Sequence, residues 1–138
     1  MIKLKFEIAK LDDRSMSMEF VINGVTVDYY EQINERIFVW ESPFNFPSTV
    51  DIRVSNKNPN DTHIDQQGNI IADKYIKLLD VVVDGLPCAP YYVNKITFTP
   101  DSGDELITNY WGFNGVARLN FNEENSFYWS IHTQNAVR

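Results

Sequence analysis

The 138-residue chain is poor in the residues that cross-linking and catalysis use. It has one cysteine, Cys88, and two histidines, His63 and His132. A single cysteine cannot form an internal disulfide, so we expect the chain to fold in a reducing compartment. Neither histidine lies in a nucleophile motif, and the chain has no G-x-S-x-G or H-x-x-x-H pattern. The sequence therefore predicts a protein that is not an enzyme; a hydrolase whose site is assembled from distant residues is an alternative.

Basic residues and long apolar runs are scarce as well. Twelve Lys and Arg stand against nineteen Asp and Glu, which gives a formal net charge of -7. Nucleic acid is therefore not an expected partner, because phosphate binding needs clustered Lys and Arg. No apolar stretch reaches the length of a membrane span, and Lys3, Lys5 and Glu7 interrupt the first apolar residues. We expect no membrane span and no signal peptide.

Helical periodicity is almost missing, and alternation of apolar and polar residues takes its place. Ile2 to Ile8 alternate in this way, and the pattern recurs on both sides of Asn23-Gly24. That dipeptide tolerates the two positive φ angles of a type I′ turn, so the sequence predicts a hairpin over about residues 17–30. The apolar phase changes between Leu78 and Leu79, which indicates a β-bulge or a strand that is buried on both faces.

These patterns predict an all-β fold. Its size suits a single domain covering residues 1–138, built as an antiparallel two-sheet sandwich of jelly-roll type with about nine strands. An up-and-down barrel is the alternative. The expected strands are residues 2–8, 17–22, 25–30, 37–40, 50–55, 76–84, 91–98, 117–121 and 127–131.

A polar loop from Asn56 to Asp73 is the first candidate site. Clustered carboxylate and amide oxygens on an irregular loop suit calcium, which takes six to eight oxygen ligands in flexible geometry. Asn and Asp are also common turn formers, so the same cluster is explained by turns alone, with a small hairpin near residues 67–69. The candidate metal ligands are Asn56, Asn58, Asp61, Asp65 and Asp73.

A second candidate site is the segment Tyr110-Trp111-Gly112-Phe113-Asn114-Gly115. Its three aromatic residues lie among glycines and outside any alternating run. Tyr110, Trp111 and Phe113 are therefore candidate ligand-binding residues that could stack on a sugar ring. The alternative is that Trp111 or Phe113 closes one end of the sandwich as a core residue. Trp40 and Trp129 fall within expected strands and are predicted to be core residues.

The stretch from Val54 to Gly85 resembles calcium-dependent carbohydrate-binding modules of the xylan-binding kind. In those modules a strand ends in an Asn-Asp pair, and a loop leads to an Asp-Arg-Asn-Leu-type strand that ends in Asp-Gly. Here Asn56-Lys57 stands at the first motif, Asp73-Lys74-Tyr75-Ile76 at the second, and Asp84-Gly85 at its end. The resemblance implies a sugar-binding function with calcium as the cofactor.

About the last ninety residues resemble small β-sandwich proteins of tailed phages, especially marine ones. The shared motifs are Asn58-Pro59-Asn60-Asp61-Thr62, Gly68-Asn69-Ile70-Ile71, Val83-Asp84-Gly85, Trp111-Gly112-Phe113-Asn114-Gly115 and Phe127-Tyr128-Trp129. This resemblance implies a virion-associated module.

The leading hypothesis is a non-enzymatic phage structural or accessory protein that decorates a capsid, tail or fibre. Its partners would be other virion proteins, copies of itself or a surface glycan. We expect such a protein to be made in the host cytoplasm and then built into the virion. The rival hypothesis is a free calcium-dependent carbohydrate-binding module.

Overall fold

The computed structural model describes residues 1–45, 48–88 and 96–121, and their regular secondary structure is almost entirely β-strand. One turn of 3-10 helix, η1 (Pro59–Asp61), is the exception. The strands are β1 (Ile2–Ala9), β2 (Ser17–Ile22), β3 (Val25–Tyr30), β4 (Ile37–Ser42), β5 (Ser48–Ser55), β6 (Thr62–Ile64), β7 (Ile70–Asp73), β8 (Tyr75–Val83), β9 (Leu86–Pro87), β10 (Thr97–Pro100), β11 (Leu106–Ile107), β12 (Tyr110–Trp111) and β13 (Gly115–Phe121).

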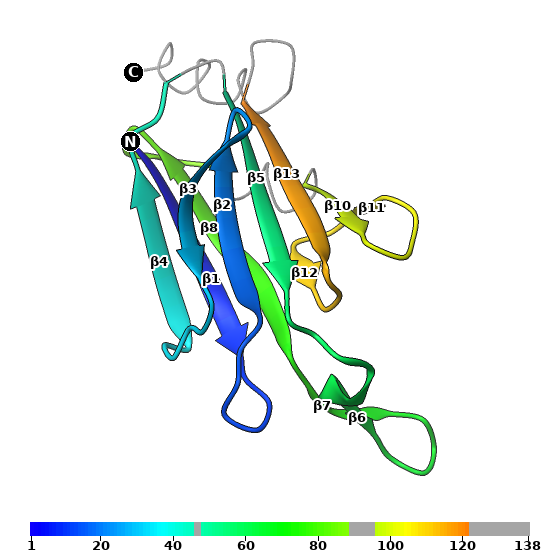
Figure 1. Ribbon diagram of the computed structural model, residues 1–138. Helices are drawn as coiled ribbons and strands as arrows, with labels where there is room; N and C mark the ends of the chain where they lie inside the picture. Colours follow the sequence, from blue (N-terminus) through cyan, green and yellow to red (C-terminus); the bar gives the residue numbers. More distant parts are fainter. Residues whose placement is uncertain (46–47, 89–95, 122–138) are drawn as a thin grey trace.

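Two antiparallel sheets form the body of the molecule (Figure 1). One has the order β12-β8-β1-β4, with β9 paired to β8, and the other has the order β11-β10-β13-β5-β2-β3. A separate two-stranded hairpin, β6–β7, projects from one end. The predicted all-β antiparallel sandwich is thus confirmed, while the jelly-roll connectivity stays a prediction. Five short strands, β6, β7, β9, β11 and β12, go beyond the nine expected, and β6 and β7 form the small hairpin expected near residues 67–69. The expected strand at 127–131 and residues 91–95 of the one expected at 91–98 lie outside the described residues, and β10 begins at Thr97.

The predicted hairpin at Asn23-Gly24 is confirmed. Ile22 pairs with Val25, which leaves a two-residue turn whose φ angles are 49° and 82°. Both angles are positive, as a type I′ turn requires. Alternation of side chains around an Asn-Gly pair therefore predicted both the turn and the two strands that it joins.

Replacing Gly24 with valine should lower the free energy of unfolding by about 1 kcal/mol or more, because a β-branched residue is strained at positive φ. A Cβ atom at this position would meet no atom within 4 Å, so backbone strain alone sets the loss. Thermal melting of Gly24→Val beside the parent measures it. An unchanged melting temperature would contradict the role given to the turn.

The change of apolar phase in β8 marks a β-bulge. Lys5 of β1 pairs with Asp80, but the next residue, Phe6, pairs with Leu78, so Leu79 has no partner in the ladder. One extra residue in β8 restores the burial of alternate side chains on each side of it. Of the two explanations that the sequence left open, the bulge is therefore present.

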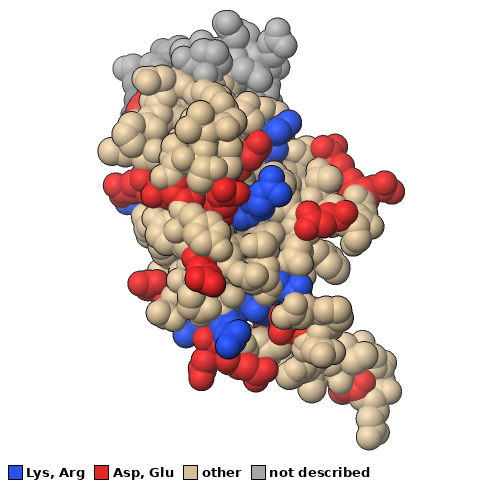
Figure 2. Space-filling model, in the orientation of Figure 1, with Lys and Arg blue, Asp and Glu red and all other residues tan. Residues whose placement is uncertain are grey.

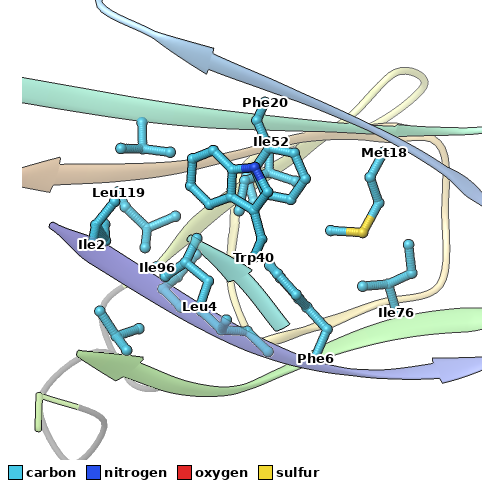
Figure 3. Packing of buried hydrophobic residues seen from close by; sticks show 14 of the residues in the cluster. Ile2, Leu4, Phe6, Met18, Phe20, Trp40, Ile52, Ile76, Ile96 and Leu119 are labelled. Carbon is cyan, nitrogen blue, oxygen red and sulfur yellow. The ribbon is translucent and has the colours of Figure 1, made fainter. Parts of the chain in front are cut away.

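The core fills the space between the two sheets (Figure 3). Phe20 of β2 and Trp40 of β4 stack with ring centroids 4.0 Å apart and planes at 9°. Phe6 of β1 meets the same Phe20 edge-on at 6.0 Å. Trp40 is buried as predicted, and its indole N–H donates a hydrogen bond of 2.6 Å to Asp28 Oδ2. Trp129 lies outside the described residues.

Loops from different parts of the chain gather at the end of the sandwich from which β6–β7 projects (Figure 1). They are the connection after β1, the connection between β3 and β4, and the segment after β5, whose residues line one common hollow. The sandwich thus acts as a rigid support for loops, the arrangement in which binding sites often occur. In the described part of the chain we find no helix whose length and apolarity would let it cross a membrane.

Candidate functional site

The carboxylate of Asp73 is the centre of the site. It ends β7 and accepts hydrogen bonds from Thr62 Oγ1 at 2.7 Å, from the Lys74 backbone N–H at 2.9 Å, from Tyr110 Oη at 2.6 Å and from Lys57 Nζ. Burial raises the pKa of Asp73, but the hydrogen bonds from Lys57, Tyr110 and Thr62 outweigh it, so the pKa lies below its usual value. Asp73 is therefore an ionised group with donors on both of its oxygens.

A second carboxylate, Asp61, is paired in a similar way. Asp61 Oδ2 accepts a hydrogen bond of 2.8 Å from the Asn58 backbone N–H and lies 3.3 Å from Lys74 Nζ. The backbone hydrogen bond and the charge of Lys74 lower the pKa of Asp61. Lys74 is itself buried, and its ammonium also donates to the Asn56 carbonyl at 2.7 Å. Two carboxylates of this loop, Asp61 and Asp73, thus each face a lysine.

The five residues that the sequence proposes as calcium ligands do not form one set of contacts. Asn56 and Asp61 share the Lys74 ammonium and Asp61 also accepts from Asn58, whereas Asp73 pairs with Lys57. Asp65 accepts hydrogen bonds of 2.9 Å from the backbone of Gln67 and Asn69 and so shapes the turn of the β6–β7 hairpin. The Asn56 amide donates to Ser17 Oγ. Within the described ranges, no three Asp, Glu, His or Cys side chains come together as metal ligands do. Because Asp61 and Asp73 are also paired with lysines, this donor set does not fit a calcium ion.

The three aromatic residues of the second candidate site have different surroundings. Trp111 is fully buried, where it lies 6.1 Å from Phe6 and 6.0 Å from Phe98 between ring centroids, and its indole N–H donates to the Thr108 carbonyl at 3.0 Å. It closes the end of the core, and a ring without exposed surface cannot stack on a ligand. The expectation that Trp111 offers a binding face is therefore corrected.

Tyr110 and Phe113 reach the surface. Tyr110 stacks on Tyr75 with ring centroids 4.5 Å apart, and burial together with the hydrogen bond to Asp73 raises the pKa of its phenol. Its hydroxyl is thus kept protonated as a donor to Asp73. Phe113 is 63% exposed. Of the three aromatic candidates, Phe113 alone presents most of its side chain to solvent.

The structure joins the two candidate sites into one. The Lys57 backbone N–H donates to Asn114 Oδ1 at 2.8 Å, and Asn114 Nδ2 donates back to the Lys57 carbonyl at 2.9 Å. The Lys57 ammonium also lies 5.9 Å from the centroid of the Phe113 ring. The polar loop and the aromatic segment, about fifty residues apart in the chain, are therefore two walls of one site. Figure 2 shows basic side chains beside acidic ones at the lower end of the molecule, where these loops lie.

Two hollows open on either side of Asn58. The one beside Phe113 has a volume of about 420 Å³ and is lined by Lys57, Asn58, Pro59, Thr62, Asp101, Ser102, Phe113 and Asn114. The other has a volume of about 580 Å³ and is lined by Leu11, Asp12, Arg14, Ser15, Glu31, Gln32, Asn56, Asn58, Asp61 and Lys74. The first combines one exposed aromatic ring with polar side chains, and all residues that line the second except Leu11 have polar or charged side chains.

Sequence reasoning missed the lysines and Asn114. Lys57 and Lys74 follow Asn56 and Asp73 directly in the chain, so a basic residue beside each end of the polar loop was the feature that could have revealed the ion pairs. Nothing in the local sequence marks Asn114 as a partner of Lys57, because their contact depends on which strands are neighbours in the sheets.

Cys88 does not take part in the site. Its thiol is buried, and burial raises its pKa to about 11. The thiol is therefore protonated at neutral pH. His63 lies on the surface of β6, and His132 is outside the described residues.

Comparisons with known proteins find similarity in fold but not in sequence. No family model matches the chain, and no curated protein matches it. A solved structure of vCBM60 in complex with galactobiose is similar over 86% of this chain and 96% of its own, with a TM-score of 0.54 and 12% identity. A second vCBM60 structure, the selenomethionine form, covers 86% and 88% with a TM-score of 0.56 and 10% identity, and is described with two families of calcium-dependent carbohydrate-binding modules. The chain thus shares the β-sandwich fold of carbohydrate-binding modules.

Proposed function

We propose that the chain is a carbohydrate-binding module that acts by binding and carries its sugar site in the hollow beside Phe113. The observation that carries the proposal is the exposed Phe113 ring at the wall of a hollow whose other side chains are mostly polar. A sugar ring presents apolar C–H faces that pack against an aromatic plane, and its hydroxyl groups point outward from the ring edge. An aromatic wall beside hydrogen-bonding groups suits this combination.

The polar side chains of the hollow supply the hydrogen bonds that the hydroxyl groups need. Asn58 offers an amide, Asp101 a carboxylate and Ser102 a hydroxyl, so donors and acceptors are both present. The Asp101 backbone N–H donates to the Asn114 carbonyl at 2.9 Å, which ties this loop to the Phe113 wall. The groups that would contact a sugar are thus held by strands and by cross-loop hydrogen bonds.

The size of the site favours a chain of sugars over a single terminal residue. The two hollows of about 420 Å³ and 580 Å³ both lie within the usual range for ligand sites and share Asn58 as a common wall. The likeness in fold to vCBM60, a structure of which holds galactobiose, supports an oligosaccharide as the class of ligand. A ligand that leaves the Phe113 hollow past Asn58 would enter the polar one.

Replacing Phe113 with alanine should weaken glycan binding about tenfold or more, the equivalent of about 1.4 kcal/mol, because the stacking surface is lost. Glycan arrays followed by calorimetry on the best oligosaccharide measure the change. Tyr29→Ala is the matched control, since Tyr29 is an aromatic side chain on β3 that is 57% exposed and lies outside both hollows. Equal affinity of Phe113→Ala and the parent would contradict the proposed site.

Attachment to a larger particle is a second candidate function, because one feature of the surface suits it. The projecting β6–β7 hairpin carries three exposed isoleucines, Ile64, Ile70 and Ile71, and apolar groups of this kind are typical of protein interfaces. Size-exclusion chromatography of the parent distinguishes the two candidates. A monomer that binds glycan supports the sugar site, and self-association that Phe113→Ala leaves unchanged supports the hairpin. The hypothesis of a virion protein stays a prediction.

A further inference from the structure

We infer that the ammonium groups of Lys57 and Lys74 take the place of a divalent cation in the loop from Asn56 to Asp73, so that the loop holds its shape without calcium. The inference has one part that concerns the loop alone and another, the effect on glycan binding, that rests on the proposed function. Both parts follow from the positions of the two ammonium groups.

The Lys57 ammonium forms a shielded ion pair with the Asp73 carboxylate. Its side chain is only 9% exposed and the Asp73 side chain only 11%, so the pair is shielded from water. The same ammonium faces the Phe113 ring at 5.9 Å. The Asp73 carboxylate holds the shielded ammonium in place. Removing the ammonium would leave Asp73 as a buried carboxylate without a compensating charge.

The Lys74 ammonium, at the other end of the loop, is buried and paired in a similar way. Its side chain is 5% exposed, and its two acceptors are Asp61 Oδ2 and the Asn56 carbonyl oxygen. A carboxylate and a backbone carbonyl are also oxygen ligands that calcium uses in proteins. Lys74 therefore occupies a carboxylate oxygen of Asp61, a residue that the sequence proposed as a metal ligand, together with a backbone carbonyl oxygen.

Charge balance makes a metal ion unnecessary at this place. Two ammonium groups face two carboxylates, Asp61 and Asp73, so the cluster is already neutral. A calcium ion would add two positive charges beside the lysines, and like charges at such distances repel. It would also have to displace donors from Asp73, whose two oxygens accept four hydrogen bonds.

The lysines also connect this loop to the proposed sugar site. Lys57 exchanges two backbone-to-amide hydrogen bonds with Asn114, which follows Phe113 in the chain. The position of the Phe113 wall thus depends on the Lys57 segment. If the loop needs no metal, the sugar site keeps its shape in a chelator as well.

Thermal melting of the parent, Lys57→Gln and Lys57→Arg, each in chelator and in millimolar calcium at equal ionic strength, tests the inference. We expect the parent and Lys57→Arg to melt alike in both buffers, since both keep a positive charge beside Asp73. Lys57→Gln should melt several degrees lower in chelator, and calcium should restore part of the loss by binding the freed carboxylate. Lys3→Gln is the matched control, because Lys3 pairs with Glu41 at 3.8 Å on the surface, where both side chains are about half exposed.

Three results would overturn the inference. One is a parent melting temperature that rises with calcium or falls in chelator. Another is Lys57→Gln melting like the parent in chelator, because the ammonium would then hold nothing in place. The last is a Lys57→Gln variant whose lowered melting temperature calcium does not raise, because a metal ion could then not replace the positive charge of the lysine.

Glycan retention by the parent in the two buffers is measured separately. Equal retention in both supports the inference, and retention that requires calcium overturns it. If the parent binds no glycan in either buffer, the proposed function fails, while the melting curves still decide whether the lysines replace a cation.

Discussion

Trp111→Ala is expected to lower the free energy of unfolding by about 3 to 5 kcal/mol, the usual loss when a buried tryptophan is cut back to alanine. Trp111 has no exposed surface, and its ring lies between Phe6 of one sheet and Phe98 of the other. Removing it leaves a cavity between the sheets, and the Thr108 carbonyl loses the indole N–H that now donates to it. Since whole domains are stable by about 5 to 15 kcal/mol, the loss is a large share of the total.

Urea denaturation measures this loss, and Phe113→Ala is the internal control. Phe113 lies two residues away in the same segment but is mostly exposed, so its truncation should leave the midpoint of unfolding nearly unchanged. The two variants therefore separate a core residue from a surface residue. If both unfold at the urea concentration of the parent, the account of Trp111 as a core residue is wrong.

Gly115→Ala is expected to destabilise the fold by about 3 kcal/mol, at the upper end of what overpacking costs. Gly115 begins β13 and pairs with Pro100 of β10 and Val54 of β5. A Cβ atom there would lie 2.4 Å from the Thr99 carbonyl oxygen and 2.8 Å from the Pro100 Cα. Both are backbone atoms of a neighbouring strand, so the strands themselves would have to move apart.

Gly103→Ala is the matched control for this variant. Its nearest atoms would be two side-chain carbons of Pro100 at 3.8 Å, which is ordinary contact. Calorimetric melting should show a much lower melting temperature for Gly115→Ala and little change for Gly103→Ala. Equal melting of the two would show that β10 and β13 are not packed as closely as described.

The sequence by itself determined most of the longer strands and the turn that joins two of them. Alternation from Ile2 to Ile8 and the Asn23-Gly24 pair depend only on neighbouring residues, since a strand repeats every two residues and a turn needs particular φ angles. The extra residue at Leu79 was visible in the same way, as a break in the alternation. Strand alternation, turn type and a β-bulge each depend on a few adjacent residues, and so they can be predicted from the local sequence.

Only the tertiary structure decided which of the candidate residues meet. Trp111 and Phe113 are two positions apart, yet one is fully buried and the other mostly exposed, because the chain leaves β12 between them and no strand pattern continues. Asp73 and Tyr110, 37 positions apart, are in contact because β12 pairs with β8, the strand that begins two residues after Asp73. Whether a carboxylate binds a metal or a lysine depends on such long-range neighbours, and the order of strands in the sheets, rather than local sequence, places them.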